Sequence, residues 1–234
     1  MKRILATMVL VLAGVTSRAD TVTTNWSSGF TASGVIPDGN LAGWSDTRVI
    51  GGLSGLISDV NLSLTLSGGN NGDLYAYLVH SSGFAVLLNR VGRDGSNPFG
   101  YGNAGINVTF NDGAATDIHY YGGTGIPSGS FQPDARNISP LSSGATLAGF
   151  DRANSGAWLS SFTNQSANGS WTLFIADVVG GGTGPTVTSW GLSLDLVPVP
   201  EASQWAMCGA MAVFGAGYFW RVRKQVTGEK SARK

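Results

Sequence analysis

Residues with the chemistry of catalysis are few in this chain and stand apart from one another. Only His80 and His119 could serve as general bases, and the sequence contains neither a Gly-x-Ser-x-Gly elbow nor a His-Glu-x-x-His metal motif. A serine hydrolase needs a base and an oxyanion hole beside its nucleophile. We therefore predict no catalytic triad, and we expect His80 to end a strand and His119 to lie in a polar loop.

Two glycine-rich segments resemble phosphate-binding loops in their letters but not in their context. Residues 100–105 spell Gly-x-Gly-x-x-Gly, yet residues 106–110, "INVTF", alternate like a strand where a dinucleotide site requires a helix. Residues 180–185, "GGGTGP", lack the Gly-Lys-Ser/Thr ending and a following helix. We exclude nucleotide binding and interpret residues 180–185 as a hairpin connection between the strands that contain Trp171 and Trp190.

Aspartates in turn-like segments are the candidate metal ligands. Calcium binds carboxylate and carbonyl oxygens, which loops supply. The five candidates are Asp73, Asp112, Asp117, Asp151 and Asp177. Their spacing matches no EF-hand loop, and aspartate commonly caps turns without binding a metal. The pattern therefore favours turn capping, with calcium kept as the one candidate cofactor.

Apolar residues alternate with polar ones along the stretch that must position these side chains. The alternation runs through residues 60–66, 106–110, 171–175 and 190–196, separated by clusters of Gly, Asn, Asp, Ser and Pro. Several short strands with this spacing predict an all-β fold, a jelly-roll β-sandwich over residues 20–197. Trp171 and Trp190 occupy inward positions, so we expect both in its core.

The two ends of the chain differ from the part between them. Residues 1–19 have basic residues, an apolar run and a small-residue cleavage site, as a secretory signal peptide has. Residues 198–204 form a proline-containing linker. Residues 205–220 are uncharged and predict a single transmembrane helix, and the basic residues Arg221, Arg223 and Lys224 in residues 221–234 predict a cytoplasmic tail.

The zero formal net charge conceals an acidic central region. Residues 20–197 contain five arginines, no lysine and twelve aspartates, which gives a net charge of −7. Nucleic acids and anionic lipids require a basic surface. We therefore exclude nucleic acid as a partner.

Residues 50–196 resemble the P domain that follows the catalytic domain of subtilisin-like proprotein convertases. The resemblance rests on residues 72–74 ("GDL"), 81–83 ("SSG"), 110–114 ("FNDGA"), 169–177 ("GSWTLFIAD") and 190–192 ("WGL"). It implies a jelly-roll sandwich that stabilises a protease. It would also attract a serine endopeptidase label, which we reject because we expect neither a catalytic domain nor a triad here.

The C-terminal region resembles the PEP-CTERM sorting signal of Gram-negative bacteria. Its motif is Pro200-Glu201-Ala202, with alanine at the usual second proline, followed by the apolar segment and the basic residues. The resemblance implies export, processing by an exosortase-type enzyme and association with extracellular polysaccharide.

These observations predict a non-enzymatic, exported domain that is membrane-anchored and then cell-surface or extracellular. We expect it to interact with a surface protein or with extracellular polysaccharide. Two alternatives stay open: an accessory P domain that assists a separate subtilisin-like serine protease, and a carbohydrate-binding module. The second would expose aromatic rings for stacking on sugars, with the candidates Trp26, Trp44, Trp158, Tyr120 and Tyr121.

Overall fold

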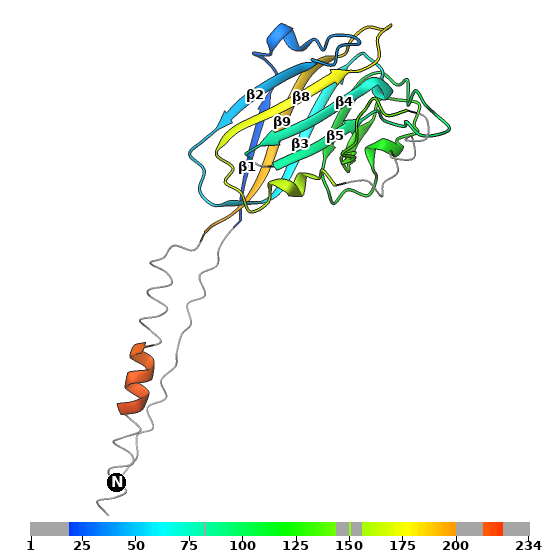
Figure 1. The fold of residues 1–234 in the computed structure, drawn as a ribbon. Coiled ribbons are helices and arrows are strands. Elements are labelled where there is room, and N and C mark those ends of the chain that lie inside the picture. Colours follow the sequence, from blue (N-terminus) through cyan, green and yellow to red (C-terminus); the bar gives the residue numbers. More distant parts are fainter. Residues whose placement is uncertain (1–18, 82, 144–149, 151–155, 200–212, 222–234) are drawn as a thin grey trace, which may run out of the picture. The chain divides into compact units, whose positions relative to one another are not determined.

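The computed structural model describes residues 19–81, 83–143, 150, 156–199 and 213–221 (Figure 1). The chain divides into two compact units between Pro198 and Val199. The first unit contains all the strands described below. In the second unit, residues 213–221 are helical.

The described part of the first unit is a two-sheet β-sandwich, as the alternation predicted. Its strands are β1 (Asp20–Trp26), β2 (Trp44–Ile50), β3 (Leu56–Ser67), β4 (Leu74–His80), β5 (Gly83–Asn89), β6 (Ile106–Phe110), β7 (Ser128–Phe131), β8 (Gly169–Asp177) and β9 (Thr186–Val197). One sheet has the order β1-β9-β3-β6-β7 and the other β2-β8-β4-β5. Strand neighbours are antiparallel except for the parallel pair β6–β7. Short 3₁₀ turns include η1 (Thr31–Gly34), η2 (Asn71–Asp73), η3 (Ile118–Tyr120) and η6 (Leu159–Phe162).

The core lies between the inner faces of the two sheets. The apolar residues of the alternating stretches are buried there, which confirms their predicted inward orientation. Trp171 and Trp190 are both 0% exposed, as predicted. Ile106 also begins a strand directly after the Gly-x-Gly-x-x-Gly letters, so the helix that a dinucleotide site needs is replaced by β6.

The predicted hairpin between the two tryptophan strands is wrong. Strand β8 belongs to the four-stranded sheet and β9 to the five-stranded sheet, so the segment between them crosses from one sheet to the other (Figure 1). The physical reason lies in the apolar alternation of both strands. Because the strands lie in opposing sheets, Trp171 and Trp190 enter the same core from opposite sides. In a hairpin both strands would lie in one sheet, and both side chains would enter the core from the same side.

This crossing segment is fixed by contacts with the loop before β2. The Asp38 carboxylate accepts hydrogen bonds from the backbone N–H groups of Gly181 and Gly182, at 3.0 and 3.3 Å. Gly184 lies so close to the chain that a Cβ atom there would overlap the backbone carbonyl oxygen of Ile36. A glycine is therefore required at position 184 for close approach of two backbone segments.

We expect Gly184→Ala to lower the free energy of unfolding by about 1–3 kcal/mol, the usual effect of overpacking. Gly182→Ala is the matched control, because a Cβ atom at that position would make only an ordinary contact with Asp38, at 3.7 Å. Urea unfolding of both variants measures the difference. Equal stabilities for the two variants would contradict this account of the crossing segment.

A buried hydrogen bond joins the two sheets at one end of the sandwich. Trp190 in β9 donates from its indole Nε1–H to Oδ2 of Asp46 in β2, at 2.7 Å. Arg48 donates from Nε to the same carboxylate oxygen, also at 2.7 Å. Trp26 in β1 packs on Trp190 with ring centroids 4.4 Å apart. This cluster supports the loops that form the cleft described next.

Candidate functional site

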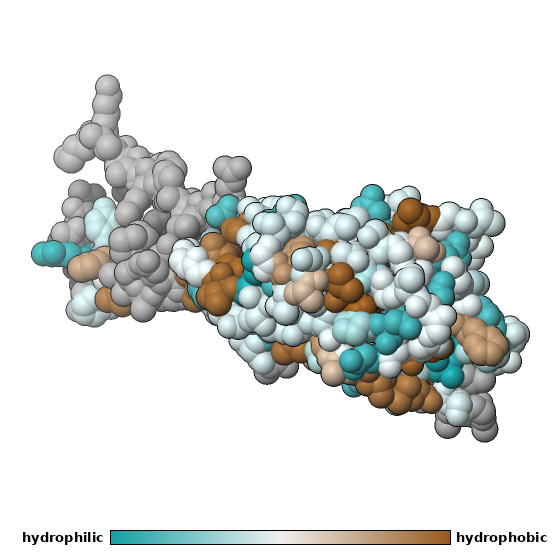
Figure 2. Space-filling view, turned by 90° about the horizontal axis from the view of Figure 1, so that it is seen from above, coloured by the Kyte–Doolittle hydropathy of each residue, from teal (hydrophilic) through white to brown (hydrophobic). Residues whose placement is uncertain are grey.

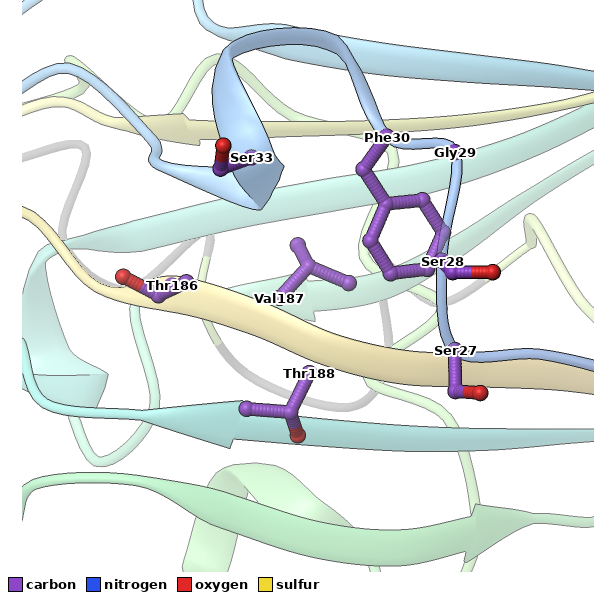
Figure 3. Close-up of a pocket in the computed structure, with 8 residues that line it drawn as sticks. All are labelled: Ser27, Ser28, Gly29, Phe30, Ser33, Thr186, Val187 and Thr188. Carbon is purple, nitrogen blue, oxygen red and sulfur yellow. The ribbon is translucent and has the colours of Figure 1, made fainter.

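An open cleft of about 470 Å³ lies between the end of β1, the turn η1 and the start of β9 (Figure 3). This volume lies within the range of small-molecule sites. Five of its lining side chains carry hydroxyl groups: Ser27, Ser28, Ser33, Thr186 and Thr188. Phe30 supplies apolar surface, and Figure 3 shows its ring pointing from the η1 side toward β9. Val187 also lines the cleft but is only 2% exposed. The lining contains no charged side chain.

The turn η1 forms one rim of the cleft in a strained backbone conformation. Ala32, Ser33 and Gly34 have consecutive positive φ angles of 50°, 54° and 83°. Left-handed conformations cost on the order of 1–2 kcal/mol per non-glycine residue. Two backbone hydrogen bonds hold the turn, from Val35 N to Ala32 O at 3.0 Å and from Ile36 N to Pro185 O at 2.9 Å. A Cβ atom on Gly34 would overlap the carbonyl oxygen of Val187, so the turn packs directly on β9.

Arg48 lies next to Phe30 of the cleft lining, and its guanidinium is bound by other residues of the domain. Its guanidinium carbon lies 5.4 Å from the Phe30 ring centre and 5.7 Å from that of Trp26, which are cation–π distances. Its Nη2 atom donates to the backbone carbonyl of Ser28 at 2.9 Å, and its Nε atom is paired with Asp46. Arg48 therefore orders the chain after β1, and the cleft lining itself stays uncharged.

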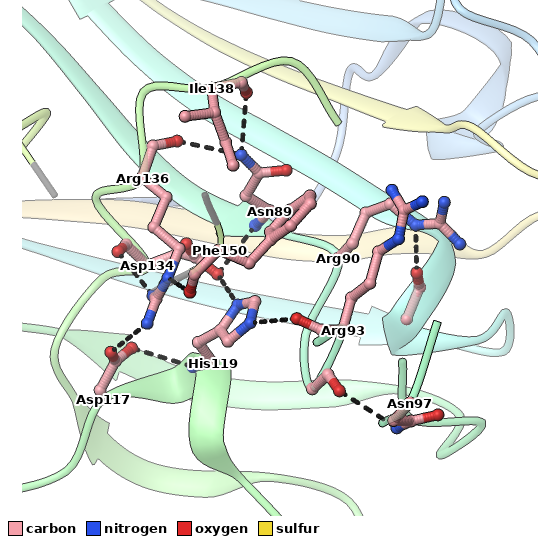
Figure 4. A network of polar contacts seen from close by, with 12 residues as sticks. Asn89, Arg90, Arg93, Asn97, Asp117, His119, Asp134, Arg136, Ile138 and Phe150 are labelled. Carbon is pink, nitrogen blue, oxygen red and sulfur yellow. Dashed lines mark hydrogen bonds and ion pairs between the residues drawn. The ribbon is translucent and has the colours of Figure 1, made fainter. Parts of the chain in front are cut away.

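A buried network of charged side chains lies at a different place, beside β5 (Figure 4). Arg136, 0% exposed, donates to Asp117 Oδ2 at 3.2 Å and to Asp134 Oδ1 at 3.1 Å. His119 lies 2.6 Å from Asp134 through Nδ1. Burial disfavours the charged guanidinium, but Asp134 and Asp117 outweigh it and raise the pKa of Arg136 above its ordinary value. The four side chains form one connected structural unit.

Both histidines of the chain have each ring nitrogen next to an acceptor. His119 faces the Asp134 carboxylate with Nδ1 and the Arg93 carbonyl with Nε2, at 2.6 and 2.9 Å. His80 faces the carbonyl oxygens of Ser170 and Ser166, at 3.1 and 2.8 Å, and stacks on Trp171 with ring centroids 4.0 Å apart. In this geometry neither ring offers a free nitrogen to remove a proton from a substrate.

His80 ends β4, as predicted, but the prediction of a polar loop for His119 is wrong. His119 lies in η3 and is 1% exposed. The adjacent Tyr120 and Tyr121 made the segment look like a surface loop. Burial of the ring is possible because Asp134 and the Arg93 carbonyl satisfy both of its nitrogens.

The structure does not gather the predicted calcium ligands at one place. Asp112 accepts from the backbone N–H groups of Leu159 and Ser160 and so caps η6, at 3.1 and 2.8 Å. Asp117 belongs to the buried network, and Asp151 lies outside the described residues. Within the described ranges no group of three or more His, Cys, Asp or Glu side chains has an arrangement that would hold a metal ion.

Asp73 and Asp177 are the two predicted ligands that the fold does bring near each other. Asp73 ends η2 and lies 3.6 Å from Arg90, while Asp177 ends β8 and is 2% exposed. Burial raises the pKa of the Asp177 carboxyl, and the nearby charges of Asp73 and Asp38 add to this effect. A hydrogen bond from the Val179 backbone N–H works in the opposite direction. The ionised form of Asp177 is therefore less favourable in the folded state than in the unfolded chain.

We expect Asp177→Asn to raise the free energy of unfolding at pH 7 by roughly 0.5–2 kcal/mol, the size common for single stabilising substitutions. A raised carboxyl pKa destabilises the folded state above that pKa, and the effect disappears as falling pH protonates the group. The advantage of the variant should therefore shrink on acidification. Thermal unfolding between pH 7 and pH 4 measures it, with Asp20→Asn on exposed β1 as the control. A difference that is independent of pH would contradict the prediction.

The aromatic candidates for sugar stacking have different environments. Trp44 is 4% exposed and donates from Nε1 to the Thr31 carbonyl, so it lacks the exposure that the carbohydrate-binding alternative would require of it. Trp26, Trp158 and Tyr121 are half-buried, and Tyr120 is 53% exposed. A further aromatic group lies on the outer face of the four-stranded sheet. There Tyr77 stacks on Phe174 and contacts Phe84, with ring centroids 4.7 and 5.3 Å apart.

Sequence reasoning missed the hydroxyl groups of the cleft. Serine and threonine at strand ends are ordinary in a chain of this composition, and Ser28 and Thr186 are far apart in the sequence. The signal that could have found the site is the run of residues 26–30, "WSSGF", where two aromatic residues flank two serines.

Several predicted segments lie wholly or partly outside the described residues. They include nearly all of the signal peptide, the sorting residues Pro200, Glu201 and Ala202, the first part of the predicted transmembrane segment, and Arg223 and Lys224. Arg221 ends the described helical segment. No helix within the described ranges is long and apolar enough to cross a membrane.

No protein-family model and no curated protein matches the chain. The solved structures that are similar to it include two from Aeromonas sobria. One is the complex of the Aeromonas sobria serine protease with its chaperone ORF2, with 14% identity, a TM-score of 0.43 and coverage of 78% of this chain and 28% of the other. The second is the serine protease of Aeromonas sobria, with 13% identity, a TM-score of 0.43 and coverage of 76% and 27%. This chain spans less than a third of the length of either matched chain.

Proposed function

We propose that this chain is a non-enzymatic, exported β-sandwich domain that binds a partner at the cell surface or in the extracellular matrix. The observation that carries the proposal is that the side chains that could act as general acids or bases are held in hydrogen bonds within the domain. Both histidines have their ring nitrogens paired, and every described aspartate from Asp38 to Asp195 accepts at least one hydrogen bond. A general acid or base needs a proton position open to the substrate.

The exposed features of the domain support binding in place of catalysis. The cleft beside η1 is open, uncharged and rich in hydroxyl groups. On the face seen in Figure 2, hydrophobic residues gather in small separate patches among polar ones. Obligate protein partners usually cover larger continuous apolar surfaces. We therefore propose a polysaccharide or a transient protein partner.

The test uses the full chain, purified from cells that express it with their own export machinery. It is immobilised and incubated with extracellular polysaccharide from the same cells, and the bound fraction and the size profile of the polysaccharide are measured. The proposal expects saturable binding with an unchanged size profile. Shortened polysaccharide would show a hydrolase, and its appearance would overturn the proposal.

Export and sorting are part of the same proposal and rest on the sequence of the two ends. We propose removal of the signal peptide after Ala19 and recognition of residues 200–202 by an exosortase-type enzyme, in a Gram-negative cell. Intact mass of the protein from fractionated cells tests this. The wild type should lack the mass beyond the Pro200 region, and the Pro200→Ala/Glu201→Ala variant should retain it. Retention of residues 205–234 in both proteins would refute the sorting step.

A second candidate function is that of an accessory P domain for a separate subtilisin-like protease. It is favoured by the positions of the residues that carry the P-domain resemblance. Residues 169–177 form β8 and residues 190–192 lie in β9, so two of the five segments belong to the strands of the sandwich, while residues 72–74 and 110–114 lie mainly in turns beside strands. The P-domain resemblance implies a jelly-roll sandwich, so a jelly-roll connection of the strands would agree with this candidate. Co-purification of a subtilisin-like protease at a fixed ratio with the full chain would favour it over polysaccharide binding.

A further inference from the structure

Four of the five hydroxyl groups that line the cleft are free to bind a ligand. Ser27, Ser28, Ser33 and Thr186 make no side-chain hydrogen bond to any residue that the structure describes, and Thr188 alone donates, to the Thr65 carbonyl at 3.1 Å. A hydroxyl group both donates and accepts, so four unpaired hydroxyls present eight or more hydrogen-bonding positions. Such a set matches a ligand that itself carries several hydroxyl groups.

The apolar part of the cleft has a fixed position. Phe30 makes an edge contact with Trp44 at 5.7 Å between ring centroids and lies beneath the Arg48 guanidinium, so its ring is held from two sides. It remains half-buried and lines the cleft together with Val187. Aromatic surface beside hydrogen-bonding groups suits a molecule with apolar C–H faces and polar edges.

The rim of the cleft is ordered in advance of binding. Backbone strain such as that in Ala32 and Ser33 persists only where surrounding contacts enforce it, and it concentrates at functional sites. Here the enforcing contacts are the packing of Gly34 on β9 and the hydrogen bond from Ile36 to Pro185. An ordered rim reduces the entropy that binding must overcome.

We propose that the cleft between η1 and β9 binds a residue of a neutral saccharide. The ligand class follows from the lining, which has hydroxyl and aromatic groups but no charge, and from the acidic character of residues 20–197. A phosphate, sulfate or uronate would meet no cation in the lining and a repulsive field from the domain. This inference rests on the proposed function, because it assigns the polysaccharide contact to one site.

The test is a calorimetric titration of the full, purified chain with neutral cello-, malto- and chito-oligosaccharides, with an oligogalacturonate as the anionic comparison. We expect binding of at least one neutral oligosaccharide and none of the oligogalacturonate. Thr186→Val and Ser28→Ala each remove one hydroxyl with little change in shape. Each should weaken binding by about three- to tenfold, as the loss of one neutral hydrogen bond does.

Thr109→Val is the matched control, since Thr109 is exposed on β6 in the same sheet and away from the cleft. It should leave the affinity unchanged. A neutral saccharide whose affinity responds to Tyr77→Ser on the other sheet, and not to Thr186→Val, would overturn the inference and leave the proposed function intact. If the chain bound its matrix polysaccharide but no neutral oligosaccharide, the inference would also be overturned and the proposed function would stand. Hydrolysis of the oligosaccharide would instead overturn the proposed function.

Discussion

Replacing Arg136 by methionine should lower the free energy of unfolding by about 3–5 kcal/mol, the usual cost of removing one member of a buried ion pair. Arg136 is 0% exposed and pairs with Asp117 and Asp134. Without it, Asp117 and Asp134 lose the guanidinium that pairs with both, and Asp134 keeps His119 and the Asn89 backbone N–H. Since domains of this size are stable by about 5–15 kcal/mol, the variant should unfold at much lower urea concentrations.

A second substitution distinguishes stranded charge from lost packing. Adding Asp117→Asn to Arg136→Met removes a carboxylate that has lost its guanidinium partner and should recover about 1–2 kcal/mol, because the effects of neighbouring residues in one network are not additive. A double variant less stable than the single one would show that the charge network is not the source of the effect.

Replacing Trp190 by alanine should cost about 3–5 kcal/mol, the range for removal of a large buried aromatic side chain. Trp190 is fully buried, packs on Trp26 and donates to Asp46 across the two sheets. The substitution leaves a cavity between the sheets and removes the hydrogen bond that links β9 to β2. Thermal and urea unfolding, followed by near-UV circular dichroism, measure the loss.

Trp190→Phe separates the two contributions. It keeps an aromatic ring in the core but removes the indole N–H, so we expect a smaller loss of about 1–3 kcal/mol, as for a buried acceptor that loses its donor. Arg48 still donates to Asp46 in this variant. If Trp190→Phe were as unstable as Trp190→Ala, the hydrogen bond to Asp46 and not the packing would account for most of the effect.

The sandwich core could be predicted from the sequence because apolar and polar residues alternate along each strand. A strand with one buried face must alternate, so the burial of Leu62, Leu64, Trp171 and Trp190 follows from their spacing. Asp112 differs, because it caps η6 from 47 residues away in the sequence, a contact that its own turn-like segment does not specify. The burial pattern, by contrast, uses only the nearest neighbours along the chain.

The candidate site could not be predicted in the same way. The cleft joins residues 27–33 to residues 186–188, and its hydroxyl groups have no distinctive spacing. His119 was misplaced for a related reason, since its burial depends on Asp134 and on the Arg93 carbonyl, which its own sequence neighbourhood does not contain. Contacts of this kind appear only when strands and loops have found their partners.

The sequence alone determined the all-β class, the inward positions of the strands and the acidic character of residues 20–197, because alternation and charge are properties of the residues themselves. Tertiary structure alone decided that β8 and β9 belong to opposing sheets, that His119 is enclosed by charged groups, and that η1 closes against β9 to form the cleft. Alternation states which face of a strand is buried, but not which strand lies beside it.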